Sequence, residues 1–428
     1  MSRPARTTRP MSAREAEDYL LGLELFGMRF GLDRMRRLTT ALGSPQERFG
    51  SVHVVGSNGK SSTARLTAAL LQRHGLRTGT YLSPHLVAFT ERVRVDDADV
   101  GAEAFAAAVE RAARAAAKVD RTLAEDDHVT QFEALTAAAY DLLARAGVDV
   151  AVVEAGLGGR FDATNVIPSA VTVLTNVGLE HTRWLGPTIT DIAREKVDVL
   201  RPGSTLVVGP GLHPEARAVA DAVAAERGAR VIAAAPADDM PLLARGTFQR
   251  ENFALARAAA AAYLRRALDP VAVRAAAAGT LVPGRFERID AGPGAEVILD
   301  GAHNPAGMAA LADTLRAELG GRPLVAVVSI LDDKDAAAML RELLPLCAAV
   351  VCTGNASPRS LSPGTLRSLA GQVGPLPEER VLVERDPRRA LELARQLAGP
   401  DGMALATGSL YLLADLLRPA GARRASAL

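Results

Sequence analysis

The chain is poor in cysteine, with only Cys347 and Cys352 among its 428 residues. So few cysteines exclude the disulfide framework of a small secreted domain and favour a protein of the reducing cytoplasm. Because the two lie close together in an apolar segment, we expect buried thiols and not a redox pair.

Aromatic residues, long apolar runs and an excess of one charge are also scarce. Aromatics make up 4% of the chain and hydrophobic residues 48%, so the core must be built from Ala, Leu and Val. The formal net charge is +1 without a basic block, which argues against a nucleic-acid binder. No uncharged apolar run reaches the roughly 18 residues of a membrane span. Residues 1–12 lack both periodicity and the apolar region of a signal peptide, so we expect a disordered tail.

The length of the chain predicts two or three domains. Residues 13–42 show a helical pattern that is broken near Gly27 and Gly31. Short β-branched runs then alternate with alanine-rich helical stretches, which predicts an α/β fold with a mostly parallel sheet. The predicted strands are 148–153, 171–175 and 206–208, and the predicted helices between them include 103–118 and 132–146.

A second, smaller α/β unit follows the Pro283–Gly284–Arg285 step, which we interpret as a hinge. We expect the domains to span residues 13–288 and 289–428. The strands predicted for the second unit are 296–299, 324–330, 349–352, 381–383 and 404–407. Two such units around one nucleotide loop usually enclose a cleft that closes on binding.

The stretch from Gly56 to Ser62, read G-S-N-G-K-S-S, follows an apolar strand and precedes a helical stretch from Thr63 to His74. Strand, glycine loop and helix together bind phosphate, because glycines expose backbone N–H groups and the helix start adds positive dipole. Lys60 adds a mobile charge, and a hydroxyl can reach a magnesium ion. The spacing is shorter than the common G-x-x-x-x-G-K-S/T form. The alternative is an ordinary turn with a capping serine.

Charged and polar residues follow further predicted strands, where doubly wound sheets place their sites. Glu154 ends an apolar strand before a glycine loop, as a magnesium-binding acid does in phosphate-loop enzymes. The alternative is a solvated loop acid. Ser83 and His85 follow the presumed second strand, where the alternative is a Ser-Pro turn. Thr130 and Glu133 have the spacing of a helix capping box.

Three more positions carry candidate chemistry. His181 lies just past a predicted strand, although a lone histidine is usually structural. Lys196 lies on a helix in Arg-Glu-Lys, where the alternative is an ordinary ion pair of little energetic value at a surface. Asp300 and His303 emerge together at a strand-to-helix turn of the second unit. Turn formation alone explains Asp300 but not the whole hexapeptide that runs to Pro305.

In order, these stretches resemble the folylpolyglutamate synthase and dihydrofolate synthase family of the Mur ligase superfamily, from about residue 32 to 417. The motifs are VVGSNGKSS, SPHLVAFTERVRV, TQFEALTAAAY, VVEAGLGGRFDATN, TNVGLEHTRWLG, REK, PGRFE, LDGAHNP and TGSLYLLADLL. The resemblance implies a phosphate-loop NTPase-like central domain and a smaller, Rossmann-like C-terminal α/β domain.

The resemblance also implies roles for individual residues. It implies an ATP site at Ser57, Asn58, Gly59, Lys60, Ser61, Ser62, Asn252, Arg285 and Asp300. It implies a pteroate or folate site at Ser83, Pro84, His85, Thr130, Gln131, Phe132, Glu133, Phe161, Asp162 and Ala163. It implies magnesium ligands at Ser83, Glu154, His181 and, where carbamylated, Lys196. It implies catalytic roles for Lys60, Lys196, Asp300 and His303.

The sequence departs from the family pattern at several of these positions. Ser57 replaces a threonine, and Ser61 replaces a glycine, which leaves open whether Ser61 or Ser62 meets the metal. Phe248 stands where a histidine is usual, which weakens an adenine-side role for that position. Gln131 occupies a slot that is often aromatic, so the pterin contact is expected to differ.

The function that the resemblance implies is ATP-dependent ligation of L-glutamate to the carboxyl group of dihydropteroate, tetrahydrofolate or both, through an acyl phosphate. It implies ATP and two magnesium ions, with a monovalent cation as a further candidate. The expected partners are small molecules, with no nucleic acid and no membrane, and a monomer is expected. A peptidoglycan-building Mur ligase would need an N-terminal nucleotide-binding domain, for which about fifty residues are too few. A related ligase acting on another acid and a non-ligase nucleotide switch remain as alternatives.

Overall fold

The computed structural model describes residues 9–23, 31–236 and 239–419. The predicted break near Gly27 and most of the predicted N-terminal tail lie outside these ranges. The last two residues of that tail are folded: Met11 packs against the hydrophobic core, and Ser12 caps the first helix through its side chain. Across the described ranges, none of the helices combines the length and apolar character needed to cross a membrane.

In the described part of the chain, the first unit is built on one eight-stranded sheet with the spatial order β4-β3-β2-β5-β1-β6-β7-β8. Its strands are β1 (Gly50–Val55), β2 (Thr78–Tyr81), β3 (Val93–Val95), β4 (Ala98–Asp99), β5 (Val150–Glu154), β6 (Val171–Leu174), β7 (Thr205–Val208) and β8 (Arg230–Ala233). Only the β2–β3 and β3–β4 pairings are antiparallel. The prediction of a mostly parallel sheet is therefore confirmed.

Helices cover both faces of this sheet because its central strands are apolar on both sides. On β5, Val150 and Val152 face one helical layer, whereas Ala151 and Val153 face the other. The first layer is α3 (Lys60–Arg73), α9 (Thr247–Leu264) and α10 (Pro270–Gly279). The opposite face is covered by α1 (Ala13–Gly22), α2 (Asp33–Ala41), α4 (Ala102–Asp120), α5 (Gln131–Ala146), α6 (Thr182–Leu185), α7 (Ile189–Val197) and α8 (Pro214–Glu226).

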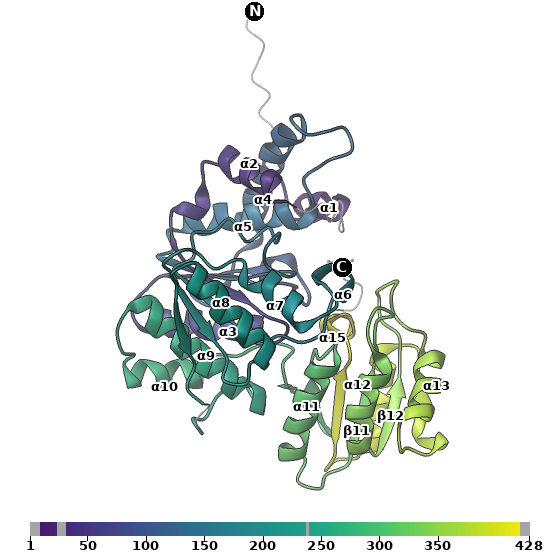
Figure 1. Ribbon diagram of the computed structural model, residues 1–428. Coiled ribbons are helices and arrows are strands. Elements are labelled where there is room, and N and C mark those ends of the chain that lie inside the picture. The colour runs from purple at the N-terminus through teal and green to yellow at the C-terminus, as the bar shows by residue number, and fades with distance from the viewer. Residues whose placement is uncertain (1–8, 24–30, 237–238, 420–428) are drawn as a thin grey trace, which may run out of the picture.

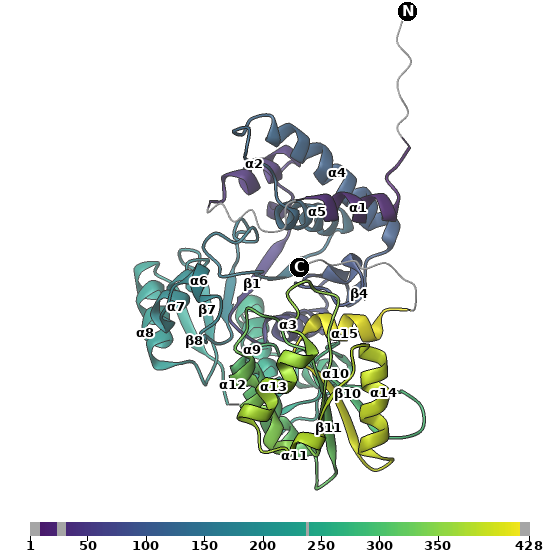
Figure 2. The same cartoon turned by 90° about the vertical axis from the view of Figure 1, so that its right-hand side faces the viewer.

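The second unit has a six-stranded sheet in the described residues, with the order β13-β12-β11-β14-β10-β9. Its strands are β9 (Glu287–Ile289), β10 (Glu296–Leu299), β11 (Leu324–Val328), β12 (Ala349–Cys352), β13 (Val381–Val383) and β14 (Met403–Thr407). Its helices are α11 (Pro305–Glu318), α12 (Ala336–Leu343), α13 (Pro363–Val373), α14 (Pro387–Ala398) and α15 (Leu410–Leu417). Only β9 is antiparallel to its neighbour. Figures 1 and 2 show this unit, green to yellow, beside the lower part of the first.

The boundary between the units differs slightly from the predicted one. A break after residue 288 would fall inside β9, which pairs with β10 of the second sheet. The linker also contributes Phe286, whose ring is buried in the core of the second unit. The second unit therefore begins at the hinge step near Gly284 and not at residue 289.

Both cysteines lie in the second unit as buried free thiols, as the sequence predicted. Burial raises the pKa of each thiol to about 12. A thiolate is the reactive form of cysteine, so neither thiol is suited to redox chemistry.

Candidate active site

A cavity of about 670 Å³ lies between the two units. It opens over the carboxyl ends of β1, β5 and β6, three adjacent parallel strands. Every residue that the sequence analysis proposed for a site lines this cavity. The structure thus brings together residues that are far apart in the chain, such as Asn58 and His303. Their individual chemical roles stay predictions.

The phosphate loop connects β1 to α3, and close packing requires glycine at two of its positions. Gly59 has φ +79°, and a Cβ there would lie 2.3 Å from Oδ1 of Asn252. At Gly56 the corresponding atom would lie 1.8 Å from Oγ1 of Thr175. Lys60 folds back on the loop, and its Nζ donates to the carbonyls of Gly56 (2.9 Å) and Ser57 (3.1 Å). The charge that an anionic phosphate needs is therefore already held at the loop.

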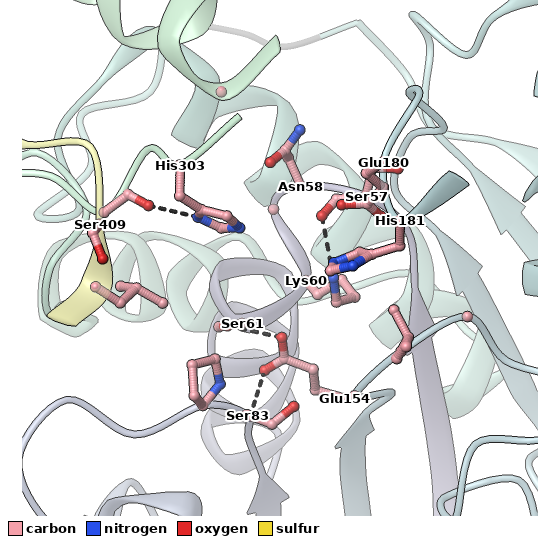
Figure 3. Close-up of a pocket in the computed structure, with 18 of the residues that line it drawn as sticks. Ser57, Asn58, Lys60, Ser61, Ser83, Glu154, Glu180, His181, His303 and Ser409 are labelled. Atoms are coloured by element: carbon pink, nitrogen blue, oxygen red, sulfur yellow. Dashed lines mark hydrogen bonds between the residues drawn. The ribbon is translucent and has the colours of Figure 1, made fainter. Parts of the chain in front are cut away.

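Glu154 joins the loop to the end of β2. Its Oε1 accepts a 2.9 Å hydrogen bond from Oγ of Ser61, and its Oε2 accepts one of 3.1 Å from the backbone N–H of Ser83, as Figure 3 shows. Burial raises the pKa of Glu154, while the charge of Lys60 opposes that shift. The alternative of a solvated loop acid is wrong, because Glu154 is only 2% exposed. A buried carboxylate between two serines suits a hard cation such as Mg²⁺.

Lys196 forms an ion pair, which was the alternative to a catalytic or metal-binding role. The pair lies in the interior of the protein and not at its surface. Its Nζ donates to Oε1 of Glu180 and to the carbonyl of Gly56, each at 2.9 Å. Burial lowers the pKa of Lys196, and the charge of Glu180 opposes this. Burial would raise the pKa of Glu180, but the ammonium of Lys196 outweighs it and holds that pKa well below its usual range. An ammonium group cannot ligate a metal, so a metal role for Lys196 requires its modification.

Two histidines face the cavity from opposite units, and burial lowers the pKa of each to about 4. His181 precedes α6 in a left-handed conformation, with φ 47°. His303 precedes Asn304, and its Nδ1 lies 2.8 Å from the carbonyl of Gly301. A carbonyl only accepts, so Nδ1 carries the proton and Nε2 has a free lone pair. Figure 3 shows the His303 ring directed from the second unit toward the phosphate loop.

The proposed substrate segment at the start of α5 is anchored by its polar residues. Thr130 and Glu133 form the predicted capping box, and Glu133 also pairs with Arg34 at 3.1 Å. Gln131 donates to the carbonyl of Leu20 at 2.7 Å. The ring of Phe132 packs so closely on Gly156 that a Cβ there would lie 2.6 Å away. Phe132 is thus the member of this segment that offers the cavity an apolar face.

Other proposed substrate residues divide in a similar way. Asp162 is buried and accepts from the backbone N–H groups of Leu157 (2.8 Å) and Thr164 (3.0 Å), so it organises the glycine loop. Phe161, in contrast, is 41% exposed, and the guanidinium carbon of Arg160 lies 5.6 Å from the centroid of its ring. His85 lines the cavity but is held by Arg92, whose Nε donates to its Nδ1 at 2.8 Å. Phe161 is thus the most exposed of these three residues, and the substrate contacts of all three stay predictions.

Arg285, in the hinge, and Asp300, directly after β10, are two of the residues proposed to bind the nucleotide. Asp300 is buried and accepts from the backbone N–H groups of Phe286 and Ala302, each at 2.8 Å. Burial raises the pKa of Asp300, and the nearby Arg285 guanidinium opposes this. Through these hydrogen bonds Asp300 connects the linker at Phe286 to the strand-to-helix turn at Ala302. Arg285 and Asp300 both line the cavity.

Several residues that the fold brings to the site were given no functional role from the sequence. Glu180 stands directly before His181, but nothing local identifies it as the partner of Lys196. Asn304 lies within the quoted LDGAHNP motif, for which turn formation was the alternative to a functional role. Asn176 accepts the backbone N–H of Asn58 at 2.8 Å. Trp184 is 38% exposed and lines the cavity, and as the chain's one tryptophan it could have been singled out.

No group of three or more His, Cys, Asp or Glu side chains is placed to hold a metal within the described ranges. The proposed first metal site has one carboxylate, Glu154, which accepts from the hydroxyl of Ser61 and the backbone N–H of Ser83. Mg²⁺ in nucleotide enzymes typically takes one or two carboxylates and completes its shell with phosphate oxygens and water. The residues present therefore fit a nucleotide-bound Mg²⁺ and not a free-standing protein cage.

Comparisons with known proteins agree with this geometry. The family described as "Mur ligase, glutamate ligase domain" matches residues 284–410. The "Dihydrofolate synthase/folylpolyglutamate synthase" of Mycobacterium tuberculosis is 35% identical over 92% of this chain and 89% of its own length.

Two solved structures align over nearly the whole chain. The Mycobacterium tuberculosis folylpolyglutamate synthase complexed with ADP has a TM-score of 0.87 and 34% identity, covering 94% of this chain and 97% of the other. A bifunctional folylpolyglutamate synthase/dihydrofolate synthase with Mn, AMPPNP and L-glutamate bound has a TM-score of 0.81 and 29% identity, covering 96% and 99%. The predicted two-domain fold is confirmed, and the chain belongs to the dihydrofolate synthase/folylpolyglutamate synthase family of Mur ligases.

Proposed function

We propose that the protein is an ATP-dependent ligase that joins L-glutamate to the carboxyl group of dihydropteroate, of a reduced folate, or of both. The observation that carries this proposal is the shared cavity. The phosphate loop, Glu154 and the His303 turn of the glutamate ligase domain border one space. ADP bound to one relative, and AMPPNP with L-glutamate bound to another, support the nucleotide and the amino acid as substrates.

The chemistry must activate a carboxylate, which is a poor electrophile because hydroxide is a poor leaving group. Transfer of the γ-phosphoryl group of ATP gives an acyl phosphate and ADP. The glutamate amine then attacks the acyl carbon, and phosphate leaves with the C–O bonding pair as the amide forms. The protein contributes chiefly position and charge. Lys60 and the loop N–H groups hold the phosphates, and the closed cleft keeps water from the acyl phosphate.

Magnesium is a further part of the proposal. Ser61, Ser83 and Glu154 would hold the first ion, which would neutralise phosphate charge when bound. The manganese in the solved bifunctional relative supports a divalent cation. A second ion near His181 would require Lys196 as a carbamate, since the amine found here pairs with Glu180. A monovalent cation, a monomeric state, the absence of a nucleic-acid partner and a cytoplasmic location stay predictions.

The test is a panel of purified enzyme with ATP, Mg²⁺ and L-glutamate, given dihydropteroate or tetrahydrofolate in parallel. ADP release should require both glutamate and at least one acid substrate. Labelling the substrate carboxylate with ¹⁸O should transfer one labelled oxygen to the released phosphate, because the acyl phosphate breaks at the acyl carbon. ATP hydrolysis that ignores both substrates would instead support a nucleotide switch. Turnover with some other carboxylate alone would point to a related ligase.

A further inference from the structure

A reciprocal amide pair crosses the cleft between the two units. Nδ2 of Asn304 donates to Oδ1 of Asn58 at 2.9 Å, and Nδ2 of Asn58 donates back to Oδ1 of Asn304 at 3.3 Å. Asn58 belongs to the phosphate loop, and Asn304 caps α11 of the second unit. The pair therefore joins the loop that would hold the nucleotide directly to the turn that carries His303.

The backbone of Asn58 and the side chain of Asn304 are also fixed within their own units. The backbone N–H of Asn58 donates to Oδ1 of Asn176 at 2.8 Å, and its carbonyl accepts from Oγ1 of Thr175 at 2.7 Å. Oδ1 of Asn304 accepts the backbone N–H of Gly307 at 2.7 Å. Because the loop backbone at Asn58 and the capping side chain of Asn304 are each held in place, the pair forms only over a narrow range of relative positions of the two units.

Space around the pair is restricted. A Cβ at Gly307 would lie 3.1 Å from Oδ1 of Asn304 and 3.5 Å from Oδ1 of Asn58. Asn304 itself is only 7% exposed. Hydrogen bonds shielded from water hold their geometry more firmly than exposed ones.

A second contact docks the same helix away from the cavity. Oγ1 of Thr314 on α11 accepts the backbone N–H of Thr247 at 3.1 Å and lies 2.9 Å from that residue's hydroxyl. Ten residues separate Asn304 from Thr314, roughly 15 Å along a helix. Neither Thr247 nor Thr314 lines the cavity, whereas Asn58 of the amide pair does, and Asn304 directly follows His303, which also lines it. Hydrogen bonds therefore hold helix α11 against the first unit at two places. One is beside the phosphate loop, and the other involves residues that do not line the cavity.

We propose that Asn304 is a positioning residue: by pairing with Asn58 it sets His303 and the start of α11 over the phosphate loop for phosphoryl and acyl transfer. This inference rests on the proposed ligase function and adds a residue to it. Without the pair, the cleft can still bind ATP at its loop. The turn then stands in a range of positions, the acyl phosphate meets water more often, and phosphate is released without amide formation.

The test uses Asn304→Ser, which keeps a neutral N-cap acceptor for α11 but removes the amide that exchanges hydrogen bonds with Asn58. We expect kcat to fall on the order of 10²-fold, as small misplacements do, with the KM for ATP changed by less than about threefold. The ratio of phosphate released to amide formed should rise. Thr314→Val is the matched control, because it removes a hydrogen bond between the units at residues that do not line the cavity, and its ratio should stay near that of the wild type.

A double-mutant cycle with Asn58→Ala separates pairing from other effects. In the Asn58→Ala background, Asn304→Ser should cost little further activity, because its partner is already absent. Additive losses, a wild-type phosphate-to-amide ratio in Asn304→Ser, or an equal rise in Thr314→Val would each overturn the inference. Thermal unfolding of each variant shows whether it is folded. If the wild-type enzyme itself showed no acid-dependent ADP release, the ligase proposal would fail instead.

Discussion

Oγ of Ser61 lies 2.9 Å from Oε1 of Glu154, so the carboxylate at the end of β5 is hydrogen-bonded to the first turn of α3. The sequence left open whether Ser61 or Ser62 faces the metal. Ser62 is 2% exposed and lies one position further along the helix, which directs it about 100° away. The Ser61 hydroxyl is therefore the one placed to join Glu154 at a magnesium ion.

Ser61→Ala should raise the Mg²⁺ concentration for half-maximal activity on the order of tenfold, about 1.4 kcal/mol of lost binding. Ser62→Ala should shift it less. The measurement is a Mg²⁺ titration of ADP release at saturating ATP. A larger shift in Ser62→Ala than in Ser61→Ala would contradict the assignment.

Lys60→Ala should lower ADP release on the order of 10²- to 10³-fold, because it removes the positive group that the loop holds toward the phosphates. Lys60→Arg is the matched variant, since it keeps the charge but not the compact ammonium, and it should recover part of the loss. Steady-state ADP release measures both. Normal activity in Lys60→Ala would exclude the phosphate-loop assignment.

Glu180→Gln should make Lys196 easier to carbamylate. Only a neutral amine reacts with carbon dioxide, and burial lowers the pKa of Lys196 while Glu180 raises it. Loss of the Glu180 charge therefore lowers that pKa further and enlarges the neutral fraction. With ¹³C-bicarbonate, a carbamate NMR signal should appear at lower bicarbonate in Glu180→Gln than in the wild type. Lys196→Arg should show no such signal, and its presence there would assign the carbamate elsewhere.

The buried His53 should make the protein less stable in mild acid. Burial lowers the pKa of His53 to about 3, against about 6.5 when unfolded. Between these values the unfolded chain binds more protons, so stability falls as the pH falls from 6.5 toward 3. His53 alone should remove about 1 kcal/mol of unfolding free energy between pH 7.5 and 5.5.

His53→Gln is the variant for this test, since its amide can still reach Oγ1 of Thr164, which lies 2.9 Å from Nε2 of His53. Urea unfolding at pH 7.5 and 5.5 gives the difference for each protein. The difference should be smaller in His53→Gln, although the half-buried His181 and His303, whose pKa values are also lowered, keep it above zero. An equal difference in both proteins would exclude His53 as a source.

Local patterns predicted much of this molecule, because they depend on neighbours in sequence. The strand, glycine loop and helix around Lys60, and the capping box of Thr130 and Glu133, require only spacings of a few residues. The partner of Lys196 was not predictable, since Glu180 is 16 positions away and their contact depends on how α7 packs. The pairing of Asn58 with Asn304 depends on the placement of two domains, which no local pattern encodes.

The predicted domain boundary shows the same limit. The Pro283–Gly284 step was visible as a hinge, but the assignment of Glu287 to the second sheet depends on its pairing with Leu299. Short strands carry little pattern of their own, so β9 could be recognised only from its neighbour.

In the central sheet, Val54 stands opposite Glu154 in the parallel register of β1 and β5. Side chains alternate between the faces of a strand, so a slip of one residue would turn Glu154 away from Ser61. Misfolded molecules of this kind would keep an intact phosphate loop yet lose its metal partner. Such molecules would be inactive and would not hydrolyse ATP unproductively. The specific activity of a preparation would therefore measure the fraction of chains whose strands are correctly aligned.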